Sequence, residues 1–160
     1  MKLIPVFIYL LFLGLYQVIF RDLIDIYGVT INLAAFLVLA VALYKSEVMT
    51  MWFGFLTGLV LSAGNPNLLG WQALVLALLG IAAYNIKERL NLDSLYTKLL
   101  LIFGGVLVHN IISLIIESDP RFYLLWANIL FGAIYTSLLA LFFFWFKEGY
   151  ITLRKIKSIF

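Results

Sequence analysis

The chain has 160 residues, of which 65% are hydrophobic and 12% charged, with a formal net charge of +3 at pH 7 and no cysteine. A soluble domain averages about 45–50% apolar and about 25% charged residues, and a fold of this size has too small an interior to hide so much apolar surface. The composition, with a mean hydropathy of +1.10, therefore excludes a soluble domain and indicates a membrane protein that crosses the bilayer several times. The absence of cysteine excludes disulfides and thiolate metal sites. The small positive charge does not indicate nucleic-acid binding.

Six apolar runs are separated by short polar segments, and each run is a predicted transmembrane helix. The third run is the shortest, because its 16 residues extend only roughly 24 Å at ~1.5 Å per residue, against a hydrocarbon core of ~30 Å. The longest polar connection, 87–98, follows the fourth run. We expect one all-α, six-helix transmembrane domain over residues 1–146. The runs are 3–20, 26–44, 48–63, 68–86, 99–116 and 122–146.

The basic residues predict the orientation of these helices. If the chain crosses six times, all of the 11 Lys and Arg residues except Arg21 and Arg121 fall on one side. The positive-inside rule then places both termini in the cytoplasm. The basic residues on that side are Lys2, Lys45, Lys87, Arg89, Lys98, Lys147, Arg154, Lys155 and Lys157.

The last segment, 147–160, is predicted to be a basic cytoplasmic tail. Leu153, Ile156 and Phe160 share one helical face, while Arg154 and Lys155 point away from it. Such a pattern is typical of an amphipathic helix that lies on the anionic inner leaflet. A frayed tail whose positive charge only sets the orientation is the alternative.

Two of the predicted helices carry small or polar residues at four-residue intervals. This spacing puts them on one face of a helix, where a neighbouring helix can approach closely. Two interpretations remain open: the stripes line a groove for the transmembrane helix of a partner, or they close the bundle on itself. The stripes are Gly54, Gly58 and Ser62 in the third run, and Asn128, Gly132 and Thr136 in the sixth.

Polar side chains within the runs are expected to face protein, because an uncompensated polar group in hydrocarbon is costly. We expect Asn32, Gln72, His109 and Asn110 to form an intramembrane polar network. His109 is the single histidine, and no Asp or Glu lies deep in any run to act with it as a proton relay. Ser62 has no evident base or orienting group. The sequence therefore predicts no enzyme, no cofactor and no metal site.

The central stretch resembles the signature region of the bacterial rod-shape-determining membrane protein family MreD. Gly58-Leu59-Val60-Leu61-Ser62 corresponds to a Gly-Leu-Leu-Leu-Asp-like helix, and Gln72-Ala73-Leu74 begins the Ala-Leu-rich helix that follows. Ile31-Asn32-Leu33 corresponds to a Pro-Asp-Leu start of the second helix. Both acidic positions of the family pattern are uncharged here, as Asn32 and Ser62. The turn between the two halves of the signature contains Gly64, Asn65, Pro66 and Gly70.

The resemblance implies a scaffold in the cell-elongation machinery of the bacterial inner membrane, one that supports peptidoglycan synthesis and cell shape. It implies as partner an MreC-like bitopic protein, within a wider complex of an MreB-like filament and a peptidoglycan synthase pair, in the lipid bilayer. Through the resemblance, the two stripes become the candidate contact for the partner helix.

A second hypothesis is the substrate-binding subunit of an energy-coupling-factor vitamin transporter, which also has about six helices and cytoplasmic termini. Such a site needs convergent polar and aromatic groups near the outer face. Against it, residues 10–14 are bulky where a two-alanine docking motif is expected. The outer groups offered by this chain are Asn65, Asn67, Trp71, Gln72, Glu117, Trp126 and Asn128.

Overall fold

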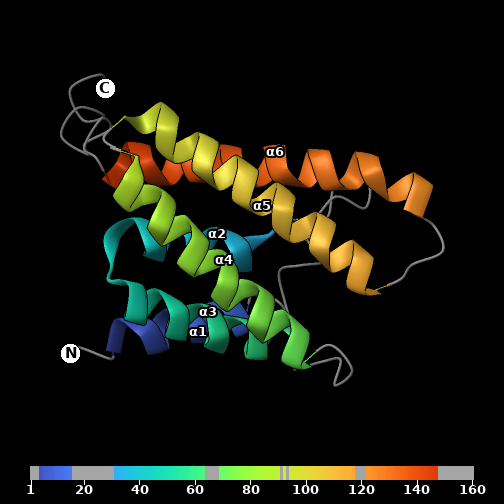
Figure 1. Ribbon diagram of the computed structural model, residues 1–160, viewed down its shortest axis with the longest axis horizontal. Coiled ribbons are helices and arrows are strands. Elements are labelled where there is room, and N and C mark those ends of the chain that lie inside the picture. Colours follow the sequence, from blue (N-terminus) through green and yellow to red (C-terminus); the bar gives the residue numbers. More distant parts are fainter. Residues whose placement is uncertain are drawn as a thin grey trace, which may run out of the picture.

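The computed structural model describes residues 4–15, 31–63, 69–90, 92, 94–117 and 122–147. These residues form six α-helices and no strand, which confirms the predicted all-α class. Successive helices run back and forth along one bundle axis (Figure 1). The helices are α1 (Ile4–Leu15), α2 (Leu33–Tyr44), α3 (Glu47–Leu61), α4 (Leu69–Arg89), α5 (Leu95–Glu117) and α6 (Phe122–Lys147).

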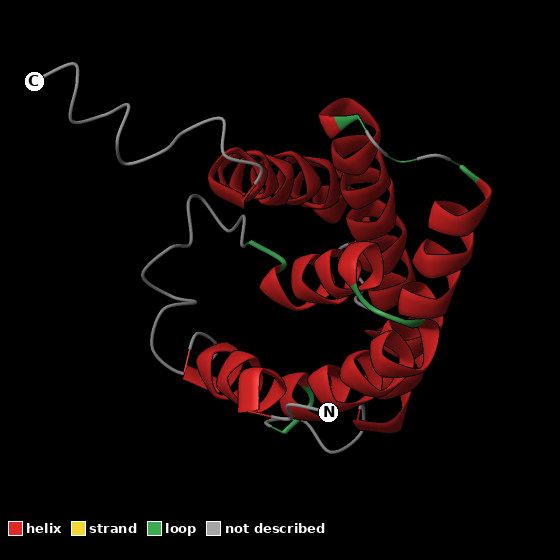
Figure 2. Cartoon of the chain, turned by 90° about the vertical axis from the view of Figure 1, so that its left-hand side faces the viewer, coloured by secondary structure: helices red, strands yellow, loops and turns green. Residues whose placement is uncertain are grey.

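Helix α2 forms the centre of the bundle. Its sequence, LAAFLVLAVALY, has no charged residue, and nine of its side chains are buried. A helix that is apolar on every face must be surrounded by other elements or by lipid, and α2 contacts α3, α4, α5 and α6. Seen along the bundle in Figure 2, one helix lies in the middle of the others. The buried residues of α2 are Leu33, Ala34, Ala35, Phe36, Val38, Leu39, Ala40, Ala42 and Leu43.

Three described helices are long and apolar enough to cross a membrane, namely Gly70–Arg89, Leu95–Ile116 and Ile129–Lys147 within α4, α5 and α6. This finding supports the prediction of a membrane protein. Helices α2 and α3, with 12 and 15 residues, are ~18 Å and ~22 Å long at 1.5 Å per residue. Both are shorter than a hydrocarbon core of ~30 Å. The predicted short third run is therefore matched by an even shorter second helix.

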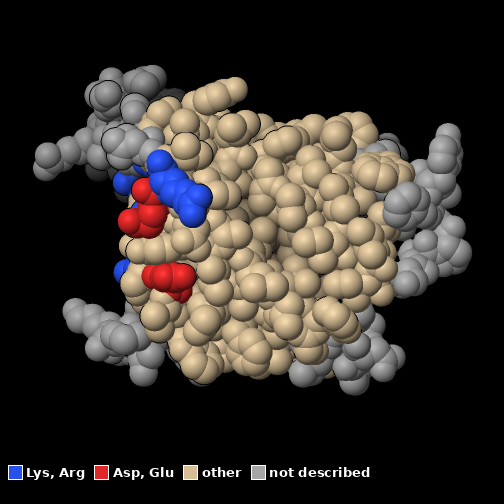
Figure 3. All heavy atoms as spheres, in the orientation of Figure 1, with Lys and Arg blue, Asp and Glu red and all other residues tan. Residues whose placement is uncertain are grey.

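The described Lys and Arg side chains gather at one end of the bundle, where α2, α4 and α6 end and α3 and α5 begin (Figures 1 and 3). At this end the ammonium of Lys147 lies 3.1 Å from the centre of the Tyr44 ring. This cation–π contact joins the last turn of α6 to the last turn of α2. Among the residues that the structure describes, the surface beyond the charged end carries no basic side chain on the face seen in Figure 3. The described basic residues are Lys45, Lys87, Arg89, Lys98 and Lys147.

Candidate functional site

Helices α3 and α4 pack very closely. Among the described glycines, an added Cβ atom would come nearest to a neighbouring helix at this contact. A Cβ atom added to Gly58 would lie 2.3 Å from Cα of Ala73 and 2.5 Å from the carbonyl oxygen of Gln72. A Cβ atom at Gly54 would lie 2.6 Å from the carbonyl oxygen of Leu76. In both cases the obstructing atoms belong to a helix backbone, which cannot rotate away. Only glycine therefore fits at these two positions, and the two backbones pack directly on each other.

This contact corrects the assignment of the first stripe to a partner-binding groove. The face of Gly54 and Gly58 is occupied by α4 of the same chain. Ser62 is also buried, and its hydroxyl donates a hydrogen bond of 2.7 Å to the carbonyl oxygen of Gly58. The stripe closes the bundle on itself, which is the second interpretation that the sequence left open.

The second stripe also faces inward where the structure describes it. Gly132 is buried, and Thr136 has no exposed surface. The hydroxyl of Thr136 donates to the carbonyl oxygen of Gly132 at 2.7 Å and accepts from the backbone N–H of Asn32 at 3.0 Å. These two residues therefore belong to the interior contact of α6 with the start of α2. The side chain of Asn128 lies outside the described residues.

A polar cluster joins the first turn of α2 to α5 and α6. The side-chain nitrogen of Asn32 lies 2.8 Å from Nδ1 of His109 and donates to Oδ1 of Asn110 at 2.7 Å. The side-chain oxygen of Asn32 accepts from the backbone N–H of Ala35 at 3.0 Å. Together with the bond to Thr136, these contacts use both side-chain N–H groups of Asn32, its carbonyl oxygen and its backbone N–H. Asn32 is the centre of the cluster because every other member bonds to it.

The cluster explains where α2 begins. The sequence predicts a run over 26–44 with Asn32 inside it, but the described helix starts at Leu33 and Asn32 is its N-cap. An asparagine oxygen satisfies a backbone N–H of the first turn, which is otherwise without an intrahelical partner. In a membrane, a helix end at depth is tolerated only where protein surrounds it. Residues on α5 and α6 supply that environment for Asn32.

Gln72, the fourth residue of the predicted network, is placed elsewhere. It lies in the first turns of α4, where its backbone carbonyl faces Gly58. Its side chain is buried, and Oε1 has no hydrogen-bond partner. The structure therefore brings together Asn32, His109 and Asn110 of the predicted set, adds Thr136 and separates Gln72 from the bonded cluster.

Four buried side-chain atoms have no hydrogen-bond partner among the described residues. They are unusual because at least nine in ten buried polar groups in proteins are paired. Two of the four, on His109 and Ser113, lie one helical turn apart on α5. Among the residues that the structure describes, no group of three or more His, Asp or Glu side chains is placed to hold a metal ion. The four atoms are Thr57 Oγ1, Gln72 Oε1, His109 Nε2 and Ser113 Oγ.

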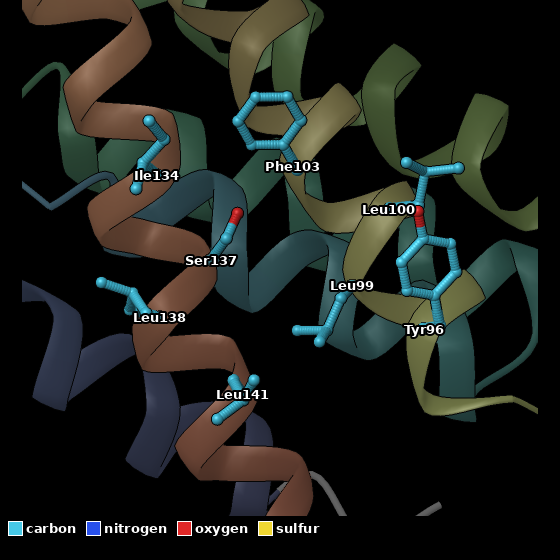
Figure 4. A pocket seen from close by; sticks show the side chains of 8 residues that line it. All are labelled: Tyr96, Leu99, Leu100, Phe103, Ile134, Ser137, Leu138 and Leu141. Atoms are coloured by element: carbon cyan, nitrogen blue, oxygen red, sulfur yellow. The ribbon is translucent and has the colours of Figure 1, made fainter.

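An apolar recess of about 320 Å³ lies between α5 and α6. Figure 4 labels the side chains that line it, which come from both helices. Leu100 and Leu138 on its walls are exposed on the outside of the bundle. Ser137 is its one hydroxyl apart from Tyr96, and Ser137 donates back to the carbonyl oxygen of Ala133 at 2.8 Å. The recess therefore offers shape to an apolar group rather than hydrogen bonds. Its lining is Tyr96, Leu99, Leu100, Phe103, Ile134, Ser137, Leu138 and Leu141.

Comparison with protein-family models, with curated proteins and with solved structures found no match. Three positions of the signature turn, Gly64, Asn65 and Pro66, lie outside the described residues, as does the predicted tail from 148 to 160. Gly70 lies in the first turn of α4 and is exposed, with open space where a Cβ atom would be. Helix packing therefore does not require a glycine at position 70.

Proposed function

We propose that this chain is a non-enzymatic membrane scaffold of the MreD type, which binds the transmembrane helix of an MreC-like partner in the bacterial inner membrane. In this role it supports peptidoglycan synthesis during cell elongation. The wider partners of the proposal are an MreB-like filament and a peptidoglycan synthase pair.

One observation carries the proposal: the two halves of the signature sequence touch each other. The resemblance rests on Gly58 in the first half and on Gln72-Ala73-Leu74 in the second. In the fold, the Cβ position of Gly58 falls 2.3 Å from Cα of Ala73. The two residues flank the turn of one helical hairpin, from the end of α3 at Leu61 to the start of α4 at Leu69. The contact gives the motif a physical reason, because it requires small residues at these positions.

The six-span topology with cytoplasmic termini is part of the proposal. It is supported by the alternation of six helices and by the basic residues at one end. Exposed tryptophans also fit a bilayer: Trp126 and Trp145 on α6 are separated by the 19 positions from 126 to 145. At 1.5 Å per residue they stand ~28 Å apart, close to the ~30 Å of a hydrocarbon core. Tryptophan is enriched at both membrane interfaces.

The partner helix then has to bind on the lipid-facing side, because the glycine stripe of α3 is occupied by α4. In the proposal it packs over the recess between α5 and α6, since a concave apolar wall gives a helix more contact area than a convex one. Within a bilayer such packing acts through van der Waals contact, because lipid tails are as apolar as leucine. Close fit therefore determines affinity.

Co-purification tests the proposal. The tagged chain, expressed in its own bacterium and extracted gently, should retain an MreC-like bitopic protein. Leu138→Trp, which fills the recess, should reduce the retained partner. Leu78→Trp on α4 is the matched control, since the two leucines are similarly exposed, at 53% and 57%. If the partner is retained equally by both variants, the recess is not the contact. If no bitopic partner is retained by the unmodified chain, the scaffold itself is wrong.

The vitamin-transporter hypothesis is favoured by one observation, the buried and unpartnered polar atoms of Gln72 and His109. A polar ligand near the outer face would use such groups. Mass spectrometry of the purified protein tests it: a bound vitamin would support a transporter subunit and contradict the scaffold.

A further inference from the structure

His109 and Ser113 present two buried polar atoms on neighbouring turns of α5 that the bonded cluster does not use. His109 is only 3% exposed, and its Nε2 has no hydrogen-bond partner. The hydroxyl of Ser113 is likewise buried and unpartnered. A buried donor left without an acceptor costs about 1–3 kcal/mol. Two such atoms so close together indicate a shared third group.

The contacts of Asn32 determine which ring nitrogen of His109 carries the proton. A backbone N–H can only donate, so the Asn32 atom that accepts from Ala35 N is the oxygen. The other atom is the NH2 group, which donates to Oδ1 of Asn110 and faces Nδ1 of His109 at 2.8 Å. Nδ1 therefore accepts and carries no proton. A neutral imidazole with a bare Nδ1 has its proton on Nε2, so the unpartnered atom is a donor.

The hydroxyl of Ser113 departs from a rule that most other helical hydroxyls of this chain follow. Those of Thr50, Ser62, Thr136 and Ser137 each donate to the carbonyl oxygen four residues earlier, at 2.7–3.0 Å. This back-bond is the usual solution for Ser and Thr inside a helix. Ser113 does not make it. Its hydroxyl is therefore free to serve a group outside its own helix turn.

Charge and size restrict what that group is. The described α2 has no charged residue, and those of α5 are Lys98 near its start and Glu117 at its end. An anion at this depth would have no counter-charge, and a cation would face the N–H of His109. Side chains four residues apart on a helix have Cβ atoms about 5–6 Å apart. The two side chains are therefore neighbours on one face of α5, and a single oxygen atom held between them hydrogen-bonds with both at ordinary distances of ~2.8 Å.

We propose that His109 and Ser113 form a buried binding site for one neutral oxygen ligand, a water molecule, which accepts from Nε2–H of His109 and hydrogen-bonds with the hydroxyl of Ser113. A polar site needs two to four partners to hold a buried water, and these two side chains supply the minimum. The site does not rest on the scaffold proposal, because its two polar atoms, Nε2 of His109 and Oγ of Ser113, are buried within the chain and lie outside the recess proposed for the partner helix.

Nuclear magnetic resonance of the full chain in lipid nanodiscs, labelled with ¹⁵N-histidine, tests the site. The chain has one histidine, so both ring signals are assigned without ambiguity. The expected spectrum has a protonated Nε2, an unprotonated Nδ1 and magnetisation transfer between Hε2 and water. Ser113→Ala should abolish this transfer and leave the tautomer unchanged. Ser137→Ala, whose hydroxyl is satisfied by its own helix, is the control and should change neither signal.

Four outcomes would overturn the proposal. A proton on Nδ1 would remove the donor. A protonated Nε2 without transfer to water in the unmodified chain would remove the ligand. Transfer that survives in Ser113→Ala would remove the serine from the site. If Hε2 instead contacts the protons of an organic molecule that mass spectrometry also detects, the occupant is a small polar metabolite and not water.

Discussion

The sharpest prediction of the fold concerns Gly58→Ala. The added methyl group would stand 2.3 Å from Cα of Ala73, whereas ordinary van der Waals contact begins at 3.4 Å. The two helices must therefore separate by about 1 Å along this contact, or α3 must rotate. Overpacking of this kind costs about 1–3 kcal/mol, and a rigid backbone on the opposing side places Gly58→Ala at the upper end, about 3 kcal/mol.

The matched control is Gly104→Ala, because the Cβ position of Gly104 on α5 has no heavy atom within 4 Å. The same chemical change there should raise the free energy of unfolding by about 0.5–1 kcal/mol, because alanine favours a helix interior over glycine. Reversible unfolding of both variants in lipid bicelles, followed by circular dichroism, measures the difference. If Gly58→Ala is as stable as Gly104→Ala, α3 and α4 do not pack backbone to backbone, and the inward assignment of the stripe is wrong.

Three further predictions follow from other parts of the fold. Gly105→Ala should cost about 1 kcal/mol in the same assay, less than Gly58→Ala, because its methyl group meets only the flexible end of Leu39 at 2.7 Å; an equal loss would contradict the argument from backbone rigidity. Asn32→Ala should cost about 2 kcal/mol, since it removes an N-cap worth ~1 kcal/mol and two interhelical bonds worth ~0.6 kcal/mol each; no loss would show that the cluster does not hold α2. Because the chain contains no cysteine, Glu88→Cys should react with an impermeant thiol reagent only from the cytoplasmic side, and labelling from outside would refute the proposed orientation.

The sequence predicted the helical class, the short third helix and the small residues at which a neighbouring helix packs closely. These features depend on hydropathy and on spacing along one helix. It did not predict whether a stripe faces its own bundle or a partner. Lipid tails are as apolar as a protein interior, so polarity does not distinguish the two sides of a membrane helix. Gly54 and Gly58 face inward only because α4 returns beside α3, which is a property of the tertiary fold.

Hydropathy alone missed the start of α2, which the resemblance placed at Ile31-Asn32-Leu33, where the structure has it. Hydropathy continues without a break across Asn32, so the run appears as one long span, whereas the helix begins where an asparagine side chain caps it. Thr136 was assigned to packing for a related reason: its role depends on the backbone N–H of Asn32, 104 positions away. A polar residue in an apolar run signals a partner, but the sequence does not tell which one.

Depletion of this protein from the organism that encodes it tests the proposed function most directly. The measurement is cell width and length by microscopy, with vitamin uptake recorded in the same cultures. A scaffold of the elongation machinery predicts that rods widen and become round while uptake is unchanged. Cells that keep their rod shape while uptake of a vitamin falls would contradict the scaffold and support the transporter subunit.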